Sequence, residues 1–171
     1  LLSVEFTRQL QQDFGIDPET GEMSEIGQLS HLDDGQLAVA NLLRDLQFHY
    51  LATMPTKDKS SDKIVSGRIV REQAFSILNR LAALKLMEAR GLLIESISSG
   101  LNSDGFELYQ RLAGNALGET GEAYQCYLLS LFDEFAQDLP LLFDRFSPQA
   151  LLFPRQPALL TLIDLINDQE L

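Results

Sequence analysis

Apolar residues recur at intervals of three and four along most of the chain, a spacing that predicts α-helices rather than strands. The cleanest run covers residues 120–139, and Pro140 is expected to end it because proline cannot continue a helix. No stretch alternates apolar and polar residues for long enough to indicate a sheet. The other runs, read with their start and stop signals, predict helices over residues 3–14, 33–54, 66–90, 103–112 and 157–168.

The segment 66–90 is the predicted centre of the fold. Its apolar stripe is unusually wide, because residues such as Phe75 and Leu86 extend it well beyond one face. A helix with this pattern is normally surrounded by other helices. We therefore expect an all-α fold, an irregular bundle of about six helices around two central apolar helices, 66–90 and 120–139. One narrow polar strip remains on the first of these, at Glu72, Ser76 and Asn79.

The segments between the predicted helices suggest how the chain is divided. Residues 16–33 are interpreted as an ordered loop, whereas 92–97 fit either a short helix or an extended segment. The polar and nearly charge-balanced run 56–63 is typical of a flexible surface loop. The prediction is an N-terminal helical extension, a flexible polar loop and a core helical domain, over residues 1–54, 55–65 and 66–171.

Composition and charge narrow the classes of function. The 171 residues suffice for one domain with a core or two small ones. With 13 Lys and Arg against 25 Asp and Glu, the formal charge of −12 disfavours binding of nucleic acid or an anionic membrane over the whole surface. No apolar run is long enough to span a membrane. The single cysteine, Cys126, cannot form an internal disulfide, and no signal pattern precedes the first helix, so we expect a cytoplasmic protein.

Residue patterns that carry catalytic chemistry are missing from the sequence. His31 and His49 lie far apart, without the clustered partners that a metal site requires. Cys126 sits among acids, which does not favour an activated nucleophile. The glycine-containing run 114–118 lacks the preceding strand of a nucleotide-binding loop. We therefore predict no catalytic, cofactor-binding or metal-binding residue in this chain.

Basic residues are concentrated between Lys63 and Arg90, where the sequence contains six Lys or Arg residues and only two acids. Lys63, Arg68 and Arg71 lie near the start of the helix 66–90 and are candidates for contact with a phosphate backbone. The alternative is ordinary surface charge that offsets the local acidity. Arg80 lies on a strongly apolar helix, so we expect it to be partly buried against an acid such as Glu88 or one on the helix 120–139.

The acidic candidates lie between Glu119 and Asp144, where six acids occur without a Lys or Arg. Asp133, Glu134 and Asp138 fall opposite the apolar stripe of the helix 120–139. One interpretation is a solvated helix face. The other is a surface that docks a basic partner.

Several sequence runs in the second half of the chain resemble the N-terminal region of large adenine-specific DNA methyltransferases. The similarity is to the PglX-like enzymes of BREX phage-defence systems and to related restriction–modification enzymes. It covers most of residues 68–168 and is looser before them. The runs that carry it most clearly are Arg-Glu-Gln-Ala-Phe at 71–75, Leu-Asn-Arg-Leu-Ala-Ala-Leu-Lys at 78–85, Met-Glu-Ala-Arg-Gly-Leu at 87–92, Leu-Phe-Asp-Arg-Phe-Ser-Pro at 142–148 and Leu-Phe-Pro-Arg at 152–155.

The resemblance implies a role in a larger enzyme. In such enzymes a helical N-terminal region precedes a Rossmann-like domain that binds S-adenosylmethionine and methylates N6 of a flipped-out adenine. The catalytic Asn/Asp-Pro-Pro-Tyr/Phe motif is not present, because this chain has no Pro-Pro pair, so no catalytic or cofactor residue carries over. The fragment is expected to be inactive alone, with S-adenosylmethionine bound by the parent protein. The implied partners are its own methyltransferase domain, DNA through that protein, and other proteins of the defence system.

A second hypothesis does not depend on the resemblance. It holds that the chain is an acidic helical protein-interaction module unrelated to methylation.

Overall fold

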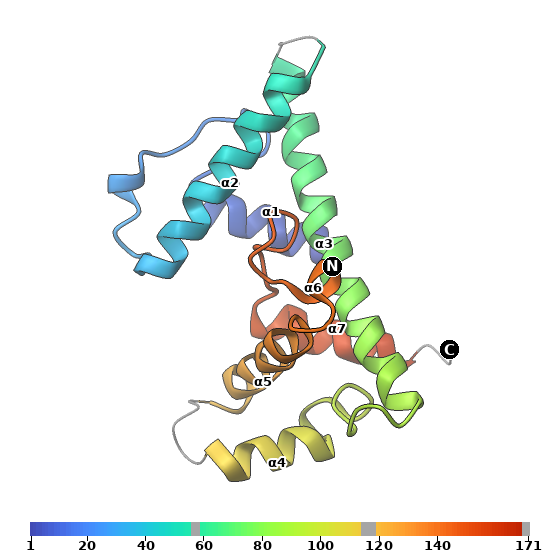
Figure 1. The fold of residues 1–171 in the computed structure, drawn as a ribbon. Coiled ribbons are helices and arrows are strands. Elements are labelled where there is room, and N and C mark those ends of the chain that lie inside the picture. The colour runs from blue at the N-terminus through green and yellow to red at the C-terminus, as the bar shows by residue number, and fades with distance from the viewer. Residues whose placement is uncertain (56–58, 114–118, 169–171) are drawn as a thin grey trace. The chain divides into compact units, whose positions relative to one another are not determined.

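The computed structural model describes residues 1–55, 59–113 and 119–168, and these residues confirm the all-α fold (Figure 1). Within them lie seven α-helices and two short 3₁₀ helices, η1 (Ile26–Gln28) and η2 (Gly100–Asn102), with one isolated β-bridge between Ile16 and Met23. The α-helices are α1 (Leu2–Gln12), α2 (Asp34–Thr53), α3 (Lys59–Ala89), α4 (Asp104–Ala113), α5 (Thr120–Phe135), α6 (Pro140–Phe143) and α7 (Gln156–Asp168).

The chain forms two compact units. Unit 1 consists of Leu1–Phe75 and Phe146–Phe153, and unit 2 consists of Ser76–Arg145 and Pro154–Leu171. Helix α3 contributes its first part to unit 1 and the remainder to unit 2.

Unit 1 packs α1, α2 and the first part of α3 around a small core. Fully buried side chains from each of these helices, including Phe6, Leu43 and Ile69, meet in this core. Helix α2 begins with a capping box, in which the Asp33 carboxylate accepts from the backbone N–H of Gln36 and the Gln36 side chain accepts from the backbone N–H of Asp33. The segment before it is ordered, as the sequence predicts.

The guanidinium of Arg44 holds that segment in place. Its nitrogens donate to the backbone oxygens of Phe14 and Ser24 at 2.9 and 3.0 Å, and to the oxygen of Ala40 on its own helix. Gly15, with φ at +61°, makes the turn that brings the chain back after α1. One buried side chain therefore ties the loop to α2.

Helix α3 begins earlier than the sequence indicates. The prediction of a flexible loop over 55–65 is wrong from Lys59 onward, and residues 56–58 lie outside the described part of the chain. Ser61 and Val65, one helical turn apart, are both buried in unit 1. Burial of this turn overrides the polar composition that suggested a loop.

The faces of α3 also differ from the prediction. Ile77, Leu81 and Leu84 are fully buried, but Phe75, Leu78 and Leu86 are 66%, 41% and 54% exposed. The predicted polar strip is half-buried instead. The apolar pattern therefore identifies the helix but overestimates how many of its sides are covered.

Unit 2 is organised around α5. Tyr124, Leu128 and Phe132 of this helix are fully buried, as are Phe106 of α4 and Phe143 of α6. Helix α5 ends at Phe135 rather than at Leu139, and a turn follows it. Leu139 precedes Pro140 and takes φ −128° and ψ 58°, because a residue before proline is driven out of the helical region.

The segment 92–97 is bent and irregular, and it forms neither a helix nor an extended strand. The Glu88 carboxylate, near the end of α3, accepts hydrogen bonds from the backbone N–H groups of Ile97 and Ser98. This contact closes the connection between α3 and η2, and it places Ser96 against α5.

Candidate functional site

The three basic candidates on α3 are exposed, but two of them are engaged by acids. Lys63 Nζ lies 2.6 Å from Glu19 Oε2, and Arg68 Nε lies 2.8 Å from Glu72 Oε1. Arg71 is exposed, and no described residue forms an ion pair or hydrogen bond with it. Arg71 therefore carries the charge that is most available to a phosphate backbone.

Arg68 belongs to a small polar network between α2 and α3. Its guanidinium carbon lies 3.9 Å from the centre of the Tyr50 ring, and Tyr50 Oη donates to Glu72 Oε2 at 2.6 Å. Burial, together with this hydrogen bond to a carboxylate, raises the pKa of Tyr50. The network joins two helices of unit 1, so Arg68 has a structural partner that competes with any ligand.

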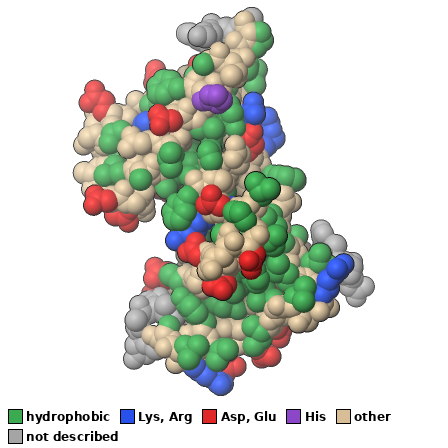
Figure 2. Space-filling view, viewed as in Figure 1, with side chains coloured by type: hydrophobic (Ala, Val, Ile, Leu, Met, Phe, Trp, Pro, Cys, Tyr) green, Lys and Arg blue, Asp and Glu red, His purple; other side chains and the backbone are tan. Residues whose placement is uncertain are grey.

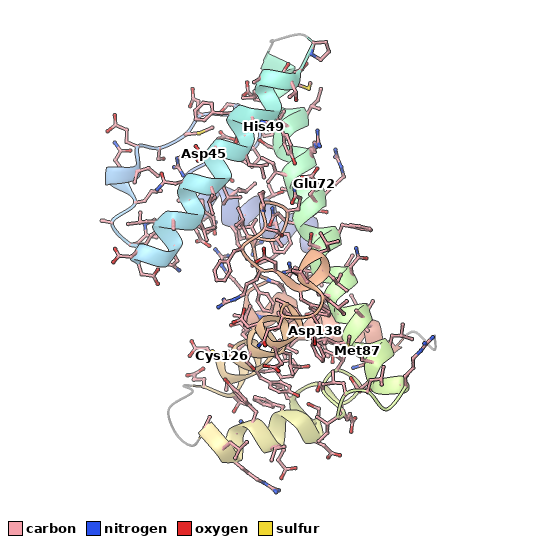
Figure 3. The ribbon with its side chains drawn as sticks, viewed as in Figure 1. Asp45, His49, Glu72, Met87, Cys126 and Asp138 are labelled. Carbon is pink, nitrogen blue, oxygen red and sulfur yellow. The ribbon has the colours of Figure 1, made fainter. Side chains whose placement is uncertain are left out.

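The three acidic candidates lie around the end of α5 in unit 2. Asp133 Oδ1 accepts from Arg145 Nε at 2.7 Å, so its charge is balanced within the unit. Glu134 contacts the Gln137 side chain, and Asp138 follows the helix in the exposed turn (Figure 3). Leu141, three residues after Asp138, is 105% exposed, so an exposed leucine follows the exposed acids in the sequence.

Arg80 is buried, as expected, but its partners differ from the predicted acids. It is 2% exposed, and its Nε and Nη2 donate at 2.7 Å to the backbone oxygens of Leu142 and Asp144. Burial lowers its pKa, and attraction to the Asp144 carboxylate opposes that effect. Glu88, one of the predicted partners, serves the backbone of residues 97–98 instead. Arg80 therefore binds the backbone at the end of α6.

The histidines and the cysteine lie in separate settings. His31 Nε2 is 3.0 Å from the Asp13 backbone oxygen, His49 lies on α2 with its ring 5.8 Å from that of Tyr50, and Cys126 is exposed on α5 (Figure 3). In the described ranges no group of three or more His, Cys, Asp or Glu residues could hold a metal ion.

An aromatic and hydroxyl cluster in unit 2 was not anticipated from the sequence. Tyr124 Oη donates to the Ser96 backbone oxygen at 2.8 Å, and Tyr127 Oη lies 2.6 Å from Ser96 Oγ. The Phe106 ring packs against both tyrosines. Burial raises the pKa of Tyr124 and of Tyr127, so both hydroxyls stay protonated in neutral solution. The spacing of the two tyrosines in the sequence indicates only that they lie on a core face of the helix. It does not reveal their contact with Ser96, because the position of Ser96 depends on the connection between α3 and η2 that Glu88 holds.

An open groove of mixed polar and apolar lining lies between η2 and α7, with a volume of about 590 Å³. Ser98, Asn102, Asp164 and Asp168 contribute its polar lining. Lys85 Nζ donates to the Ile166 backbone oxygen and to the side chain of Asn167, which is one of the residues that line the groove. The charged residues in its lining are Asp164 and Asp168, and no Lys, Arg or His from the described residues lines the groove beside them.

Comparisons with known proteins add no constraint to this geometry. No family model, no curated protein and no solved structure matches the chain. In the described part of the chain, no helix combines the length and the apolar composition needed to cross a membrane.

Proposed function

We propose that this chain is a non-catalytic helical N-terminal region of an adenine-specific DNA methyltransferase from a phage-defence or restriction–modification system. The observation that carries the proposal is the resemblance of residues 71–92 and 142–155 to that region of such enzymes. Its role would be to support the catalytic domain, the DNA or a partner of the system, while the parent protein binds S-adenosylmethionine.

The contacts made by these two runs support a scaffold role. In unit 1, the Gln73 side chain donates to the Pro148 backbone oxygen at 2.8 Å and accepts from the Leu152 N–H at 2.9 Å. In unit 2, Arg80 binds the Leu142 and Asp144 oxygens. The runs that carry the resemblance therefore contain the side chains that hold residues 142–152 on α3.

The test is to determine the reading frame beyond Leu171 and to assay the protein that it encodes. We expect an Asn/Asp-Pro-Pro-Tyr/Phe motif downstream and transfer of a labelled methyl group from S-adenosylmethionine to adenine N6. A frame that stops at Leu171, or that continues without the motif, contradicts the proposal. The Gln73→Ala variant of the longer protein should bind the cofactor normally and lose thermal stability, as a supporting region requires.

The alternative is an acidic helical protein-interaction module unrelated to methylation. The observation that favours it is that Glu134, Asp138 and Leu141, at the end of α5 and the start of α6, are all exposed. For a basic partner identified by affinity capture, charge reversal of Glu134 and Asp138 to Lys should weaken binding. The matched control is reversal of Glu119 and Glu122, which changes the total charge equally at the other end of α5. Equal effects of both pairs would indicate non-specific attraction and contradict a docking site at the α5–α6 corner.

A further inference from the structure

Helix α4 leaves an apolar surface without a partner in unit 2. Leu108 and Leu112 of this helix are 48% and 80% exposed, and Ile94 is 48% exposed. Figure 2 shows green hydrophobic side chains over α4, next to blue and red ones. We refer to Ile94, Leu108 and Leu112 as the α4 patch.

Leu108 and Leu112 of the α4 patch are one turn apart on the exposed side of the helix. Gly105 lies at the packed border beside them, where an added Cβ would collide with Tyr127 Oη of α5. Ile94 Cγ2 lies 3.0 Å from the position that a Cβ on Gly105 would take, so Ile94 covers the gap that the glycine leaves. The other side of α4 packs through Phe106, which is fully buried. The three side chains of the patch therefore keep between 48% and 80% of their surface exposed after α4 has packed within unit 2.

A pair of charged residues borders one edge of the α4 patch. Glu107 and Arg111 form an ion pair one turn apart along that edge. When two identical helices pair antiparallel about a two-fold axis, the same edge of both copies meets. When the two-fold axis crosses at the height of residue 110, midway between the two leucines, Leu108 faces Leu112 of the other copy. Glu107 then lies only about 3 Å along the helix axis from Arg111 of that copy. The acid of this edge in one copy therefore lies near the base of the same edge in the other copy.

We propose that the occupant of the α4 patch is a second copy of this chain, docked through its own α4 in an antiparallel, two-fold symmetric pair. Leucines fill the centre, Ile94 residues extend the apolar contact on one side, and Glu107–Arg111 pairs border the other. This inference is independent of the methyltransferase proposal, because it uses only the surface of unit 2.

The charge of the whole chain sets the salt dependence of this pairing. Each copy carries a formal charge of −12, so two copies repel at low ionic strength. Added salt screens that repulsion, while apolar burial at the patch persists. We therefore expect dimerisation to strengthen with salt, the opposite of the trend for a basic partner.

The experiment is sedimentation equilibrium of the 171-residue chain across micromolar to sub-millimolar concentrations at low and high salt. We expect a monomer–dimer equilibrium that Leu112→Glu weakens at least about tenfold, since it places a charge in the apolar centre. The matched control is Leu141→Glu, at a leucine of α6 that is 105% exposed, and it should leave the equilibrium unchanged. Circular dichroism of each variant reports whether the fold persists.

Charge exchange supplies a readout that mere loss of folding would not reproduce. Arg111→Glu should weaken the dimer, and combining it with Glu107→Arg should restore it, because both the internal and the intermolecular pairs re-form. A chain that stays monomeric under all conditions overturns the proposal. So does a dimer that tolerates Leu112→Glu, or one that Leu141→Glu abolishes, because the contact then lies on another surface.

Discussion

Buried guanidinium groups are the clearest structural devices at the level of single residues. Arg44 and Arg80 are 8% and 2% exposed, and each donates its hydrogen bonds to backbone oxygens. A charged donor forms stronger hydrogen bonds than a neutral one, which helps to offset the cost of burying it. Each arginine thereby fixes a loop or a short helix that has few apolar contacts of its own.

Removing the Arg80 guanidinium should leave two partly buried carbonyl groups without their hydrogen-bond donors. We expect Arg80→Met to lower the free energy of unfolding by about 2–4 kcal/mol, because the Leu142 and Asp144 oxygens lose their donors. Urea denaturation measures the change. Arg90→Met, at an exposed position after α3, is the control and should change stability by less than about 0.5 kcal/mol. Similar losses in both variants would contradict the role assigned to Arg80.

Two buried glutamines allow a matched comparison. Gln47 and Gln73 are both 0% exposed, but neither polar atom of the Gln47 amide has a hydrogen-bond partner in the described residues. We expect Gln47→Met to raise the free energy of unfolding by about 1–2 kcal/mol and Gln73→Met to lower it by a similar amount. Thermal and urea denaturation measure both. A loss on Gln47→Met would show that its amide is bonded in solution.

At the level of elements, two helical glycines have opposite roles. A Cβ on Gly105 would lie 2.8 Å from the Glu95 backbone oxygen and would also collide with Tyr127 Oη. On Gly67 it would meet only the flexible end of Arg71, at 3.4 Å. We expect Gly105→Ala to lower the free energy of unfolding by about 1–3 kcal/mol. Gly67→Ala should raise it by about 0.5–1 kcal/mol, since alanine favours a helix interior. Chemical denaturation of both variants tests the pair, and equal effects would contradict the assigned packing of α4.

Two buried tyrosines of helix α5 make the stability of unit 2 depend on pH in the alkaline range. The pKa values of Tyr124 and Tyr127 are raised by burial, so the folded state holds these protons more tightly than the unfolded state. This stability is fully present below the unfolded tyrosine pKa of about 10 and is lost as the pH rises toward the higher folded values. We expect stability, measured by denaturation between neutral and strongly alkaline pH, to fall above that point. A Tyr127→Phe variant should show a shallower fall, and an unchanged slope would contradict the assignment.

The charge of the whole molecule limits contact with DNA. Because the formal charge is −12 and Lys63 and Arg68 are engaged by acids, we expect weak binding confined to the Arg71 region. Fluorescence anisotropy with a short duplex should show binding only at low salt. Arg71→Glu should remove most of it and Lys63→Glu less. Binding that is unaffected by Arg71→Glu would place any DNA contact elsewhere.

Local patterns account for the helices, and distant contacts account for most of the disagreements. The helix predicted over 103–112 agrees with α4 to within one residue, because the sequence signals that predict it are local. The start of α3 was placed too late because the polar residues around Ser61 are buried by packing within unit 1. The sequence does not reveal that Lys63 and Asp133 are already engaged in ion pairs and so are less available to a ligand. Their partners, Glu19 and Arg145, lie 44 and 12 residues away in the chain.

The amino-acid sequence by itself determined that this protein is helical, where most of its helices lie, and that its charge is strongly acidic. The helices follow from side-chain periodicity and from glycine and proline signals, which act over a few residues. The charge follows from composition alone. Only the tertiary structure decided which face of α3 is covered and which atoms Arg80 and Gln73 bind. Those partners lie 62 to 79 residues away, so their contacts exist only once the chain has folded.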